Sequence, residues 1–388
     1  MSALASIAST AKRAISPART AATVPLLINP TDLVNLPKAT TKVLDVSWHM
    51  PNSARKPTPE YLAGPRIPGA LRWDLDRIAN PKTAEASARA EDEPEAWRVS
   101  ELAENILGLG HMLPGPRRFA EACSKLGIKP TDHVVVYDSL GIFSAPRGAF
   151  TFTAMNHEKV SVLDGGLPRY RVEGFPLDEQ PLASEEEGMK QAGVTQQSEY
   201  PVPSFKRSHV KTYEQVAENA KQDIEADTAD LVLDARSRER WSGAAPEPRP
   251  GISSGHMPHA LSLPFTALLS PTSADGTKSY TTFLPIEQLR EVIVRALASP
   301  RASLDLAIAD GGLTAEELAV GRQRWAEIQR GQRGVTWSCG SGMTAAVGIW
   351  AMRLVAAAEG QGLLDNLALY DESWTGYAMR ESSEIVKE

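Results

Sequence analysis

Short apolar runs alternate with helical stretches along the chain and predict a sheet covered by helices. Residues 134–136 form one such run, made of three valines. Residues 117–126, which follow Pro116, and residues 344–359, which precede Gly360, have the spacing and the end signals of helices. Because parallel strands are joined by helices that pack on the sheet, the alternation predicts an α/β fold, with a mainly parallel sheet and helices on both faces.

The pattern of apolar and polar residues occurs twice, in the same order. Four pairs of segments match: 43–46 with 232–235, 67–70 with 257–260, 134–138 with 335–339, and 163–167 with 370–374. In the first pair, an apolar run ends in Asp45 or Asp234 and a loop containing Trp follows. The repeat predicts two tandem copies of one α/β unit.

The repeat also predicts where the domains begin and end. We expect an N-terminal domain at residues 24–175 and a C-terminal domain at residues 206–382. Between them, residues 176–205 are rich in Pro, Gln, Ser and Glu and lack a sustained apolar period, which is typical of a linker. Residues 80–100 and 301–332 interrupt the shared plan, and we expect both to be insertions on the surface.

The first 23 residues have the composition of a transit peptide. They contain Lys12, Arg13 and Arg19 but neither Asp nor Glu, and they are otherwise mostly Ala, Ser and Thr. This pattern predicts a mitochondrial presequence at residues 1–23, with a cytoplasmic pool as a second location. The alternative is a disordered tail that stays attached.

Composition and charge exclude several classes of protein. The net charge of -7 argues against direct nucleic-acid binding, which needs clustered Lys and Arg. No apolar run approaches the roughly 18 residues of a membrane span. Cys123 and Cys339 are the only cysteines, so a disulfide framework and a four-ligand zinc site are both unexpected. We expect no metal and no cofactor.

Cys339 stands in a loop whose sequence favours an anion. A strand-like segment ends at Ser338, Gly340 and Gly342 follow the cysteine, and a helix begins near Thr344. Glycines let successive N–H groups point inward, and a helix start adds the positive end of its dipole, so a thiolate or persulfide on Cys339 would be stabilised. An inert buried cysteine is the alternative, and we expect that structural role for Cys123.

The segment Cys339-Gly340-Ser341-Gly342-Met343-Thr344 resembles the active-site loop of the tandem-domain rhodanese family. Within that family, Gly-Ser-Gly is similar to the loop of the 3-mercaptopyruvate sulfurtransferases, whereas thiosulfate sulfurtransferases typically carry Arg-Lys-Gly. The resemblance extends over segments 67–70, 111–115, 144–147, 163–166, 234–236, 247–251 and 255–258. It implies two rhodanese-like domains, of which the first is catalytically inactive because Asp138 or Ser139 replaces the cysteine.

The resemblance also implies roles for the residues around Cys339. Arg240 and Arg249 match two arginines that bind the donor, a task that suits the guanidinium fork, and the loop residues Gly340, Gly342, Met343 and Thr344 would contact substrate. Ser341, His111 and Asp76 match a proposed proton relay. As alternatives, each arginine is a solvated surface charge, and His111 and Asp76 have only structural roles.

These assignments predict a sulfurtransferase with a Cys339 persulfide as its intermediate. Sulfur would pass from 3-mercaptopyruvate to a thiol, thioredoxin or cyanide, with release of pyruvate. One alternative is thiosulfate:cyanide sulfur transfer, and another is persulfide relay to a partner protein, as in tRNA thiolation. A cysteine phosphatase is excluded, because Ala345 stands where such a loop needs Arg.

One segment departs from the family pattern. The family often has Asp-Gly-Ser-Trp near the C-terminus, whereas this chain has Asp371-Glu372-Ser373-Trp374. A glutamate in place of glycine leaves the conformation of this turn open, because glycine adopts positive φ angles that other residues avoid.

Overall fold

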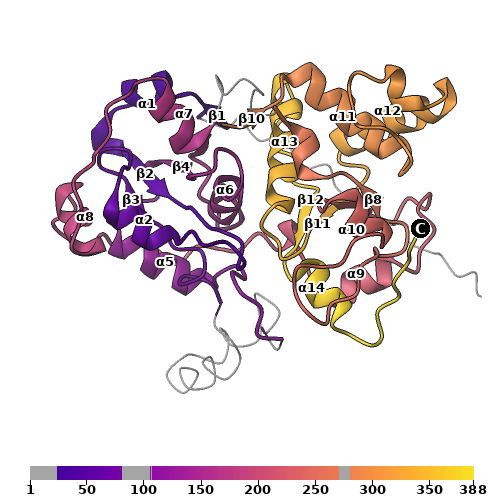
Figure 1. Ribbon diagram of the computed structural model, residues 1–388, viewed down its shortest axis with the longest axis horizontal. Helices are drawn as coiled ribbons and strands as arrows, with labels where there is room; N and C mark the ends of the chain where they lie inside the picture. The colour runs from indigo at the N-terminus through magenta and orange to yellow at the C-terminus, as the bar shows by residue number, and fades with distance from the viewer. Residues whose placement is uncertain (1–23, 81–104, 106, 271–279) are drawn as a thin grey trace, which may run out of the picture.

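The chain forms two similar halves that lie side by side (Figure 1). The computed structural model describes residues 24–80, 105, 107–270 and 280–388. We call residues 24–205 the first half and residues 206–388 the second half. The first sheet contains β1 (Leu27–Ile28), β2 (Thr41–Asp45), β3 (Leu71–Arg72), β4 (His133–Tyr137) and β5 (Val160–Leu163). The second contains β6 (Val210–Lys211), β7 (Leu231–Asp234), β8 (Leu261–Ser262), β11 (Val335–Ser338) and β12 (Leu367–Tyr370).

Both sheets have the same strand order and are parallel throughout. The orders are β1-β5-β4-β2-β3 and β6-β12-β11-β7-β8. All pairings in them are parallel, including β2 with β4 and β7 with β11. This confirms the predicted α/β fold in two tandem copies. In each sheet the chain runs outward in opposite directions from the central pair, and ligands of α/β proteins bind at the carboxyl ends of such a pair.

Strand β4 explains why the sheet is covered on both faces. All five of its residues are buried, as expected of a strand with helices on both sides. Val134 and Val136 join the core that contains Phe119, whereas Val135 and Tyr137 face a second core. An unbroken apolar run is therefore the sequence signature of this strand.

The helices of the two halves cover these sheets. In the first half they are α1 (Pro30–Asn35), α2 (Pro57–Ala63), α5 (Pro116–Lys125), α6 (Ala145–Ala154), α7 (Gly166–Val172) and α8 (Glu185–Gln191). In the second half they are α9 (Tyr213–Asn219), α10 (Arg238–Ser242), α11 (Ile286–Ala298), α12 (Ala315–Gln329), α13 (Ala345–Ala358) and α14 (Ser373–Ala378). Helices α5 and α13 confirm the two predicted from periodicity. A small antiparallel pair, β9 (Leu269–Ser270) with β10 (Thr282–Phe283), completes the fold.

Helices α6 and α13 face each other and join the halves (Figure 1). Every residue of α6 is buried, and so are twelve of the fourteen residues of α13. Across the junction, Trp350 donates through Nε1 to the Leu26 carbonyl at 3.1 Å, and Arg353 donates to Oγ1 of Thr153 at 3.0 Å. The hydrophobic core is consequently continuous from one sheet to the other.

Two polar segments pack more closely than their composition predicts. In residues 301–332, helix α12 packs against α11 and buries Trp325 and Ile328, although most of its other residues are polar. In residues 176–205, α8 lies on the first half, and Leu182 and Tyr200 are buried. Residues 1–23 and most of residues 80–100 lie outside the described residues.

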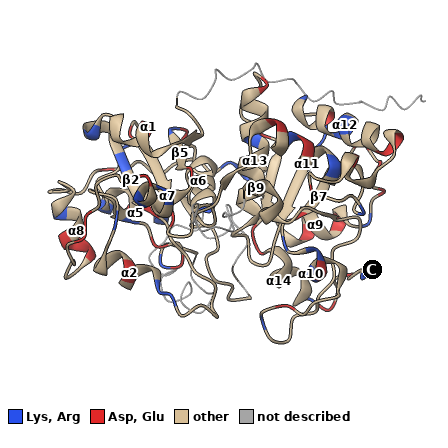
Figure 2. Cartoon of the chain, turned by 45° about the horizontal axis from the view of Figure 1, so that its top comes forward, with Lys and Arg blue, Asp and Glu red and all other residues tan. Residues whose placement is uncertain are grey.

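Charged residues are distributed over both halves (Figure 2). In the described part of the chain, blue and red segments are interspersed along the ribbon, and α8 begins with three glutamates. None of the described helices combines the length and apolar character that crossing a membrane requires. No continuous basic stretch is present among the described residues, in line with the net charge of -7.

We predict that acid destabilises the fold partly through two buried histidines. Burial lowers the pKa of His157 and of His209 from 6.5 to about 4. Between these values the unfolded chain binds more protons than the folded chain, so the stabilisation is complete above pH 6.5 and is lost as pH falls toward 4. Each histidine should contribute a slope of about 1.4 kcal/mol per pH unit in this window.

Urea unfolding of the His157→Gln variant between pH 4 and pH 7 measures this slope. We expect a shallower dependence than in the unchanged protein, because glutamine does not titrate. The control is His259→Asn at an exposed position, which should keep the original slope. An unchanged slope in the His157→Gln variant would contradict the prediction.

Candidate active site

Cys339 lies directly after β11, at the carboxyl end of the central strand pair of the second sheet. Its side chain is buried, and the backbone N–H of Gly342 donates to Sγ at 3.1 Å. Gly342 has a φ of 82°, and a Cβ at this position would lie 2.9 Å from the Asp371 carbonyl oxygen. Only glycine fits this turn without strain, and the turn aims a backbone donor at the sulfur. An anion on Sγ is favoured by this arrangement.

Ser373 supports the backbone of the cysteine. The N–H of Cys339 donates to Oγ of Ser373 at 3.0 Å, and this hydroxyl donates to the Tyr370 carbonyl at 3.1 Å. Trp374 returns a backbone hydrogen bond to the Cys339 carbonyl at 2.9 Å. Ser373 was not predicted as a site residue, although it stands in the repeat segment 370–374. The turn after β12 thus fixes the cysteine from behind.

Glu372 does not disturb this turn. Its backbone is right-handed helical, with φ of -66° and ψ of -24°, so the family's glycine is not required at this position. The positive φ of the turn, 52°, falls on Ser373 instead. The Glu372 carboxylate forms an ion pair with Arg380. Glutamate therefore fits at position 372 without backbone strain.

Arg240 and Arg249 both lie beside Gly340. A Cβ on Gly340 would be 3.2 Å from Nη2 of Arg240 and 3.6 Å from Nη1 of Arg249. Arg240 comes from α10, which follows β7 and begins with Ser237 as its N-cap. Arg249 comes from the loop after α10, and its guanidinium has no hydrogen-bond or ion-pair partner among the residues that the structure describes. The two guanidinium groups converge on the residue next to the cysteine.

A buried glutamate holds Arg240 in place. The side chain of Glu247 is 2% exposed and pairs with Arg240 through both carboxylate oxygens, with Nε to Oε1 at 3.1 Å. Glu247 also accepts from Nη1 of Arg236 at 2.7 Å, and Arg236 in turn pairs with Asp234. Arg236 lies 4.1 Å from the ring of Trp374 and is buried, so its contacts are structural.

Asp76 and His111 are brought together in the first half. Nδ1 of His111 lies 3.1 Å from Oδ1 of Asp76, and Nε1 of Trp48 donates to Oδ2 at 2.9 Å. The imidazole packs edge-on against Trp48, with 4.8 Å between ring centroids. Nε2 of His111 is buried without a hydrogen-bond partner among the described residues. The hydroxyl of Ser341 likewise makes no hydrogen bond with a described residue.

The environment of Asp76 favours its charged form. Partial burial raises the pKa of this carboxyl, but the hydrogen bond and charge of His111 and the hydrogen bond from Trp48 lower it by more. The pKa of Asp76 therefore lies below its usual value. A carboxylate at this position orients the imidazole and stabilises an imidazolium.

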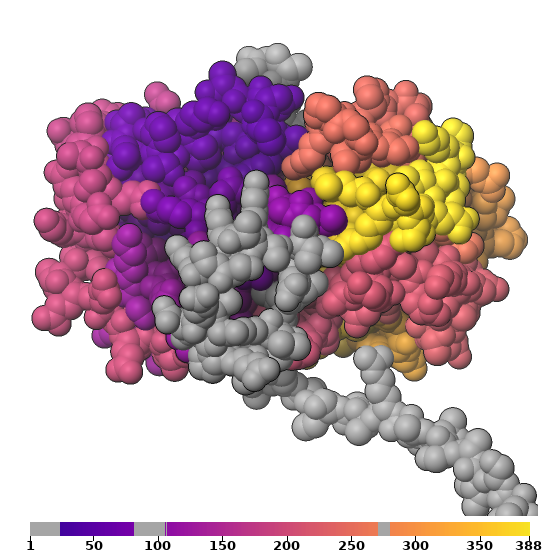
Figure 3. Space-filling view, turned by 90° about the horizontal axis from the view of Figure 1, so that it is seen from below, coloured from indigo at the N-terminus to yellow at the C-terminus, as the bar shows by residue number. Residues whose placement is uncertain are grey.

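Arg147 connects the first half to the cysteine loop. Its guanidinium donates to the Gly342 carbonyl at 3.2 Å, to the His111 carbonyl at 2.8 Å and to Oδ1 of Asp371 at 2.6 Å. Asp371 also accepts from the N–H of Leu113 at 2.8 Å. Figure 3 shows purple residues of the first half in direct contact with the yellow C-terminal segment. Arg147 and Asp371 were not predicted as site residues, although Arg147 stands in a segment that carries the resemblance and Asp371 stands in the repeat segment 370–374.

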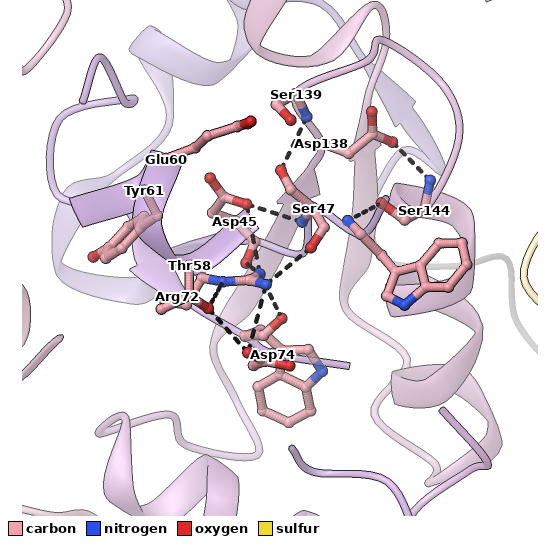
Figure 4. A network of polar contacts seen from close by, with 12 residues as sticks. Asp45, Ser47, Thr58, Glu60, Tyr61, Arg72, Asp74, Asp138, Ser139 and Ser144 are labelled. Atoms are coloured by element: carbon pink, nitrogen blue, oxygen red, sulfur yellow. Dashed lines mark hydrogen bonds and ion pairs between the residues drawn. The ribbon is translucent and has the colours of Figure 1, made fainter. Parts of the chain in front are cut away.

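The equivalent loop of the first half carries its own anion. Asp138, which Figure 4 shows, directly follows β4. Cys339 follows β11 in the same way. Its carboxylate accepts five backbone N–H groups at 2.9 to 3.0 Å, from residues 140, 141, 143, 144 and 145. The repeated loop is therefore an anion cradle in this half, filled by the residue at the cysteine position.

Comparison with known proteins finds relatives over most of the chain. No protein-family model matches. The thiosulfate/3-mercaptopyruvate sulfurtransferase 2 of Arabidopsis thaliana is 33% identical over 363 residues, 91% of this chain and 83% of that protein. The mitochondrial thiosulfate/3-mercaptopyruvate sulfurtransferase 1 of the same plant is 36% identical over 304 residues, 75% of this chain and 69% of that protein. The crystal structure of Tum1 from Saccharomyces cerevisiae matches with a TM-score of 0.65 at 27% identity, covering 94% of this chain and 99% of that one.

We predict that the Arg147→Ala variant loosens the cysteine loop. Removing one partner of a buried ion pair should lower the free energy of unfolding by about 3 to 5 kcal/mol. In the folded protein, amide hydrogen exchange of residues 339–344 should become at least about tenfold faster, because the Gly342 carbonyl and Asp371 lose their donor. Hydrogen exchange with mass spectrometry measures both local and global opening.

The matched control is Arg66→Ala. Arg66 is equally buried and pairs with Asp178, but both residues lie in the first half. This variant should also lose stability while exchange in residues 339–344 keeps its original rate under native conditions. Equal exchange in the two variants would contradict a specific connection between Arg147 and the cysteine loop.

Proposed function

Because this chain belongs to the family of the thiosulfate/3-mercaptopyruvate sulfurtransferases, we propose that Cys339 carries sulfur as a persulfide and that 3-mercaptopyruvate is the donor. The chain is a sulfurtransferase with two rhodanese-like units. The observation that carries the proposal is the backbone donor aimed at Sγ of Cys339, with two arginines beside the next residue. Together they supply an anion site at a nucleophilic sulfur.

In the first half-reaction, the Cys339 thiolate attacks the thiol sulfur of 3-mercaptopyruvate. An S–S bond forms, the C–S bond of the donor breaks, and its electron pair remains on the carbon as the enolate of pyruvate. Protonation of that carbon gives pyruvate and leaves a persulfide on Cys339. The loop that favours a thiolate favours the persulfide anion for the same reason, because both place negative charge beside the N–H of Gly342.

The charges around the loop support a donor with a single negative charge. Arg236, Arg240 and Arg249 provide three positive charges, and Asp234 and Glu247 provide two negative ones, so one positive charge is left. That charge belongs to Arg249, the arginine without a described partner. A carboxylate with a neutral thiol matches it, whereas thiosulfate has two negative charges and would remain partly unpaired in a desolvated site.

Proton transfer to the enolate is assigned to Ser341, His111 and Asp76. The hydrogen bond between His111 and Asp76 supports this, because a carboxylate orients the imidazole and stabilises its charged form. The unpartnered Nε2 of His111 is available to a substrate or to Ser341. Gly340, Gly342, Met343 and Thr344 would form the wall of the substrate site.

In the second half-reaction, a thiolate or a cyanide ion attacks the outer sulfur of the persulfide. The acceptor takes this sulfur, and the Cys339 thiolate is restored. We propose a small thiol, thioredoxin or cyanide as the acceptor. Persulfide relay to a partner protein uses the same chemistry, and capture of a stable acceptor together with slow turnover on small thiols would favour it.

The first unit is assigned no sulfur chemistry of its own, because Asp138 occupies the place of the nucleophile. Domain limits at residues 24–175 and 206–382 are part of this proposal. So is a mitochondrial location, which the basic presequence at residues 1–23 and the name of one plant relative support. Imaging of the full chain beside a variant without residues 1–23 tests the location.

We predict that 3-mercaptopyruvate adds one sulfur atom to Cys339. Mass spectrometry of the intact protein should show a gain of about 32 Da, lost again on treatment with a thiol. The Cys339→Ser variant should show no gain and no turnover. The Cys123→Ala variant is the control and should gain the same mass, because Cys123 is buried inside α5. Turnover by the Cys339→Ser variant would exclude the proposed nucleophile.

We also predict the donor preference. kcat/KM should be at least about tenfold higher for 3-mercaptopyruvate than for thiosulfate, and Arg249→Gln should lower the 3-mercaptopyruvate value about a hundredfold through loss of a charged contact. Arg238→Ala is the control, because its guanidinium contacts the Pro300 carbonyl and not the loop. A clear preference for thiosulfate in the unchanged protein would refute the proposed donor.

A further inference from the structure

The duplicated fold creates a second ligand position, in the first half. The central strand pairs are β11 with β7 in one sheet and β4 with β2 in the other. Cys339 occupies the carboxyl end of the first pair. At the carboxyl end of the second pair lies a cavity of about 590 Å³, lined by Asp45 and Ser47 from the end of β2 and by Ser139 from the end of β4. Its position is that of a binding site in an α/β sheet.

This cavity has no sulfur nucleophile, and its anion cradle is already filled. The carboxylate of Asp138 accepts hydrogen bonds from five backbone N–H groups. Ser139, the next residue, faces the cavity and donates its N–H to Oγ of Ser47 at 3.0 Å (Figure 4). A ligand here would therefore contact the side chains around the cavity and leave the cradle undisturbed. The position is suited to binding.

The two halves place an arginine and a glutamate in the same relation to the loop. In the first half, Arg55 pairs with both oxygens of Glu60, at 2.9 and 2.7 Å, and donates to Oγ of Ser139 at 3.1 Å. In the second half, Arg240 pairs with Glu247 and lies beside Gly340. Ser139 and Gly340 are equivalent positions, because each is the second residue after its strand, β4 or β11. The binding geometry is thus repeated although the chemistry is not.

The cavity combines a free positive charge with an apolar wall. Glu60 is engaged by Arg55, and Asp45 shares the buried Arg72 with Asp74, at 3.7 and 3.8 Å. Arg171 also lines the cavity and is exposed, and its guanidinium has no hydrogen-bond or ion-pair partner in the described part of the chain. Leu167 and Val172, from the same helix α7, provide apolar surface beside it.

We propose that this cavity binds a small carboxylate with a compact apolar body, independently of the cysteine site. The carboxylate pairs with Arg171 at the rim, where Arg55 adds a second donor, and the apolar body lies on the α7 side of the cavity. The ligand class follows from the guanidinium of Arg171, which has no described partner, and from the aliphatic wall. The inference does not depend on the donor or the acceptor of the sulfur transfer.

Ligand-detected NMR of the full chain with sodium isovalerate tests the proposal. The Arg240→Ala, Arg249→Ala double variant removes the anion site at the cysteine loop and should still show saturable binding. In that background, Arg171→Ala should weaken isovalerate by about tenfold or more, because a charge-assisted contact is lost. Arg169→Ala is the matched control on the same helix, because Arg169 pairs with Asp164 and Glu173, and it should bind as before.

Two further probes test the ligand class. Isovaleramide, which has the same shape without the charge, should bind at least about tenfold more weakly than isovalerate. Acetate, which lacks the apolar body, should also bind about tenfold more weakly. The proposal is overturned if the double variant shows no saturable binding, if Arg171→Ala binds as tightly as the control, or if either probe equals isovalerate.

Discussion

The arrangement of the site depends on the buried guanidinium of Arg147. It donates hydrogen bonds to the carbonyls of His111 and Gly342 and to the carboxylate of Asp371, so three acceptors from three chain segments meet at one planar group. Burying a guanidinium is costly unless its donors find acceptors, and here the acceptors belong to both halves. The cysteine loop can therefore reach its final geometry only when the two halves are docked.

Duplication explains how this docking arose from ordinary parts. Asp164 and Asp371 end equivalent strands, and each reaches across to the other half, where Asp164 accepts from the N–H of Phe283 and Asp371 from that of Leu113. The loops after β4 and β11 are equivalent too, and both surround a negative charge or a group that can carry one. Asp138 makes that charge permanent, whereas Cys339 makes it reactive. The residue that directly follows the central strand thus distinguishes the structural loop from the one with the nucleophile.

Local patterns in the sequence were sufficient for much of the fold. The structure confirms the repeat, the buried strand at residues 134–136, and helices α5 and α13. The strand and the helices are predictable because their patterns lie among residues that are close in the sequence. The contacts of Arg147 with Gly342 and Asp371 join residues about two hundred positions apart, and no local period records such a pairing. The prediction of a surface insertion at residues 301–332 missed the packing of helix α12, because the helix is largely polar in composition although it has a buried face around Trp325.

Backbone strain shows how firmly the site is held. Ser373 and His111 have φ angles of 52° and 44°, and each is buried on one side of the cysteine loop. Such conformations cost about 1 to 3 kcal/mol each and persist only where the surroundings enforce them. Ser373 supports the Cys339 N–H, and the His111 carbonyl accepts from Arg147. Each strained residue therefore supplies a hydrogen bond that supports the loop, Ser373 from within the second half and His111, through Arg147, from the first half. Neither half alone contains the complete site.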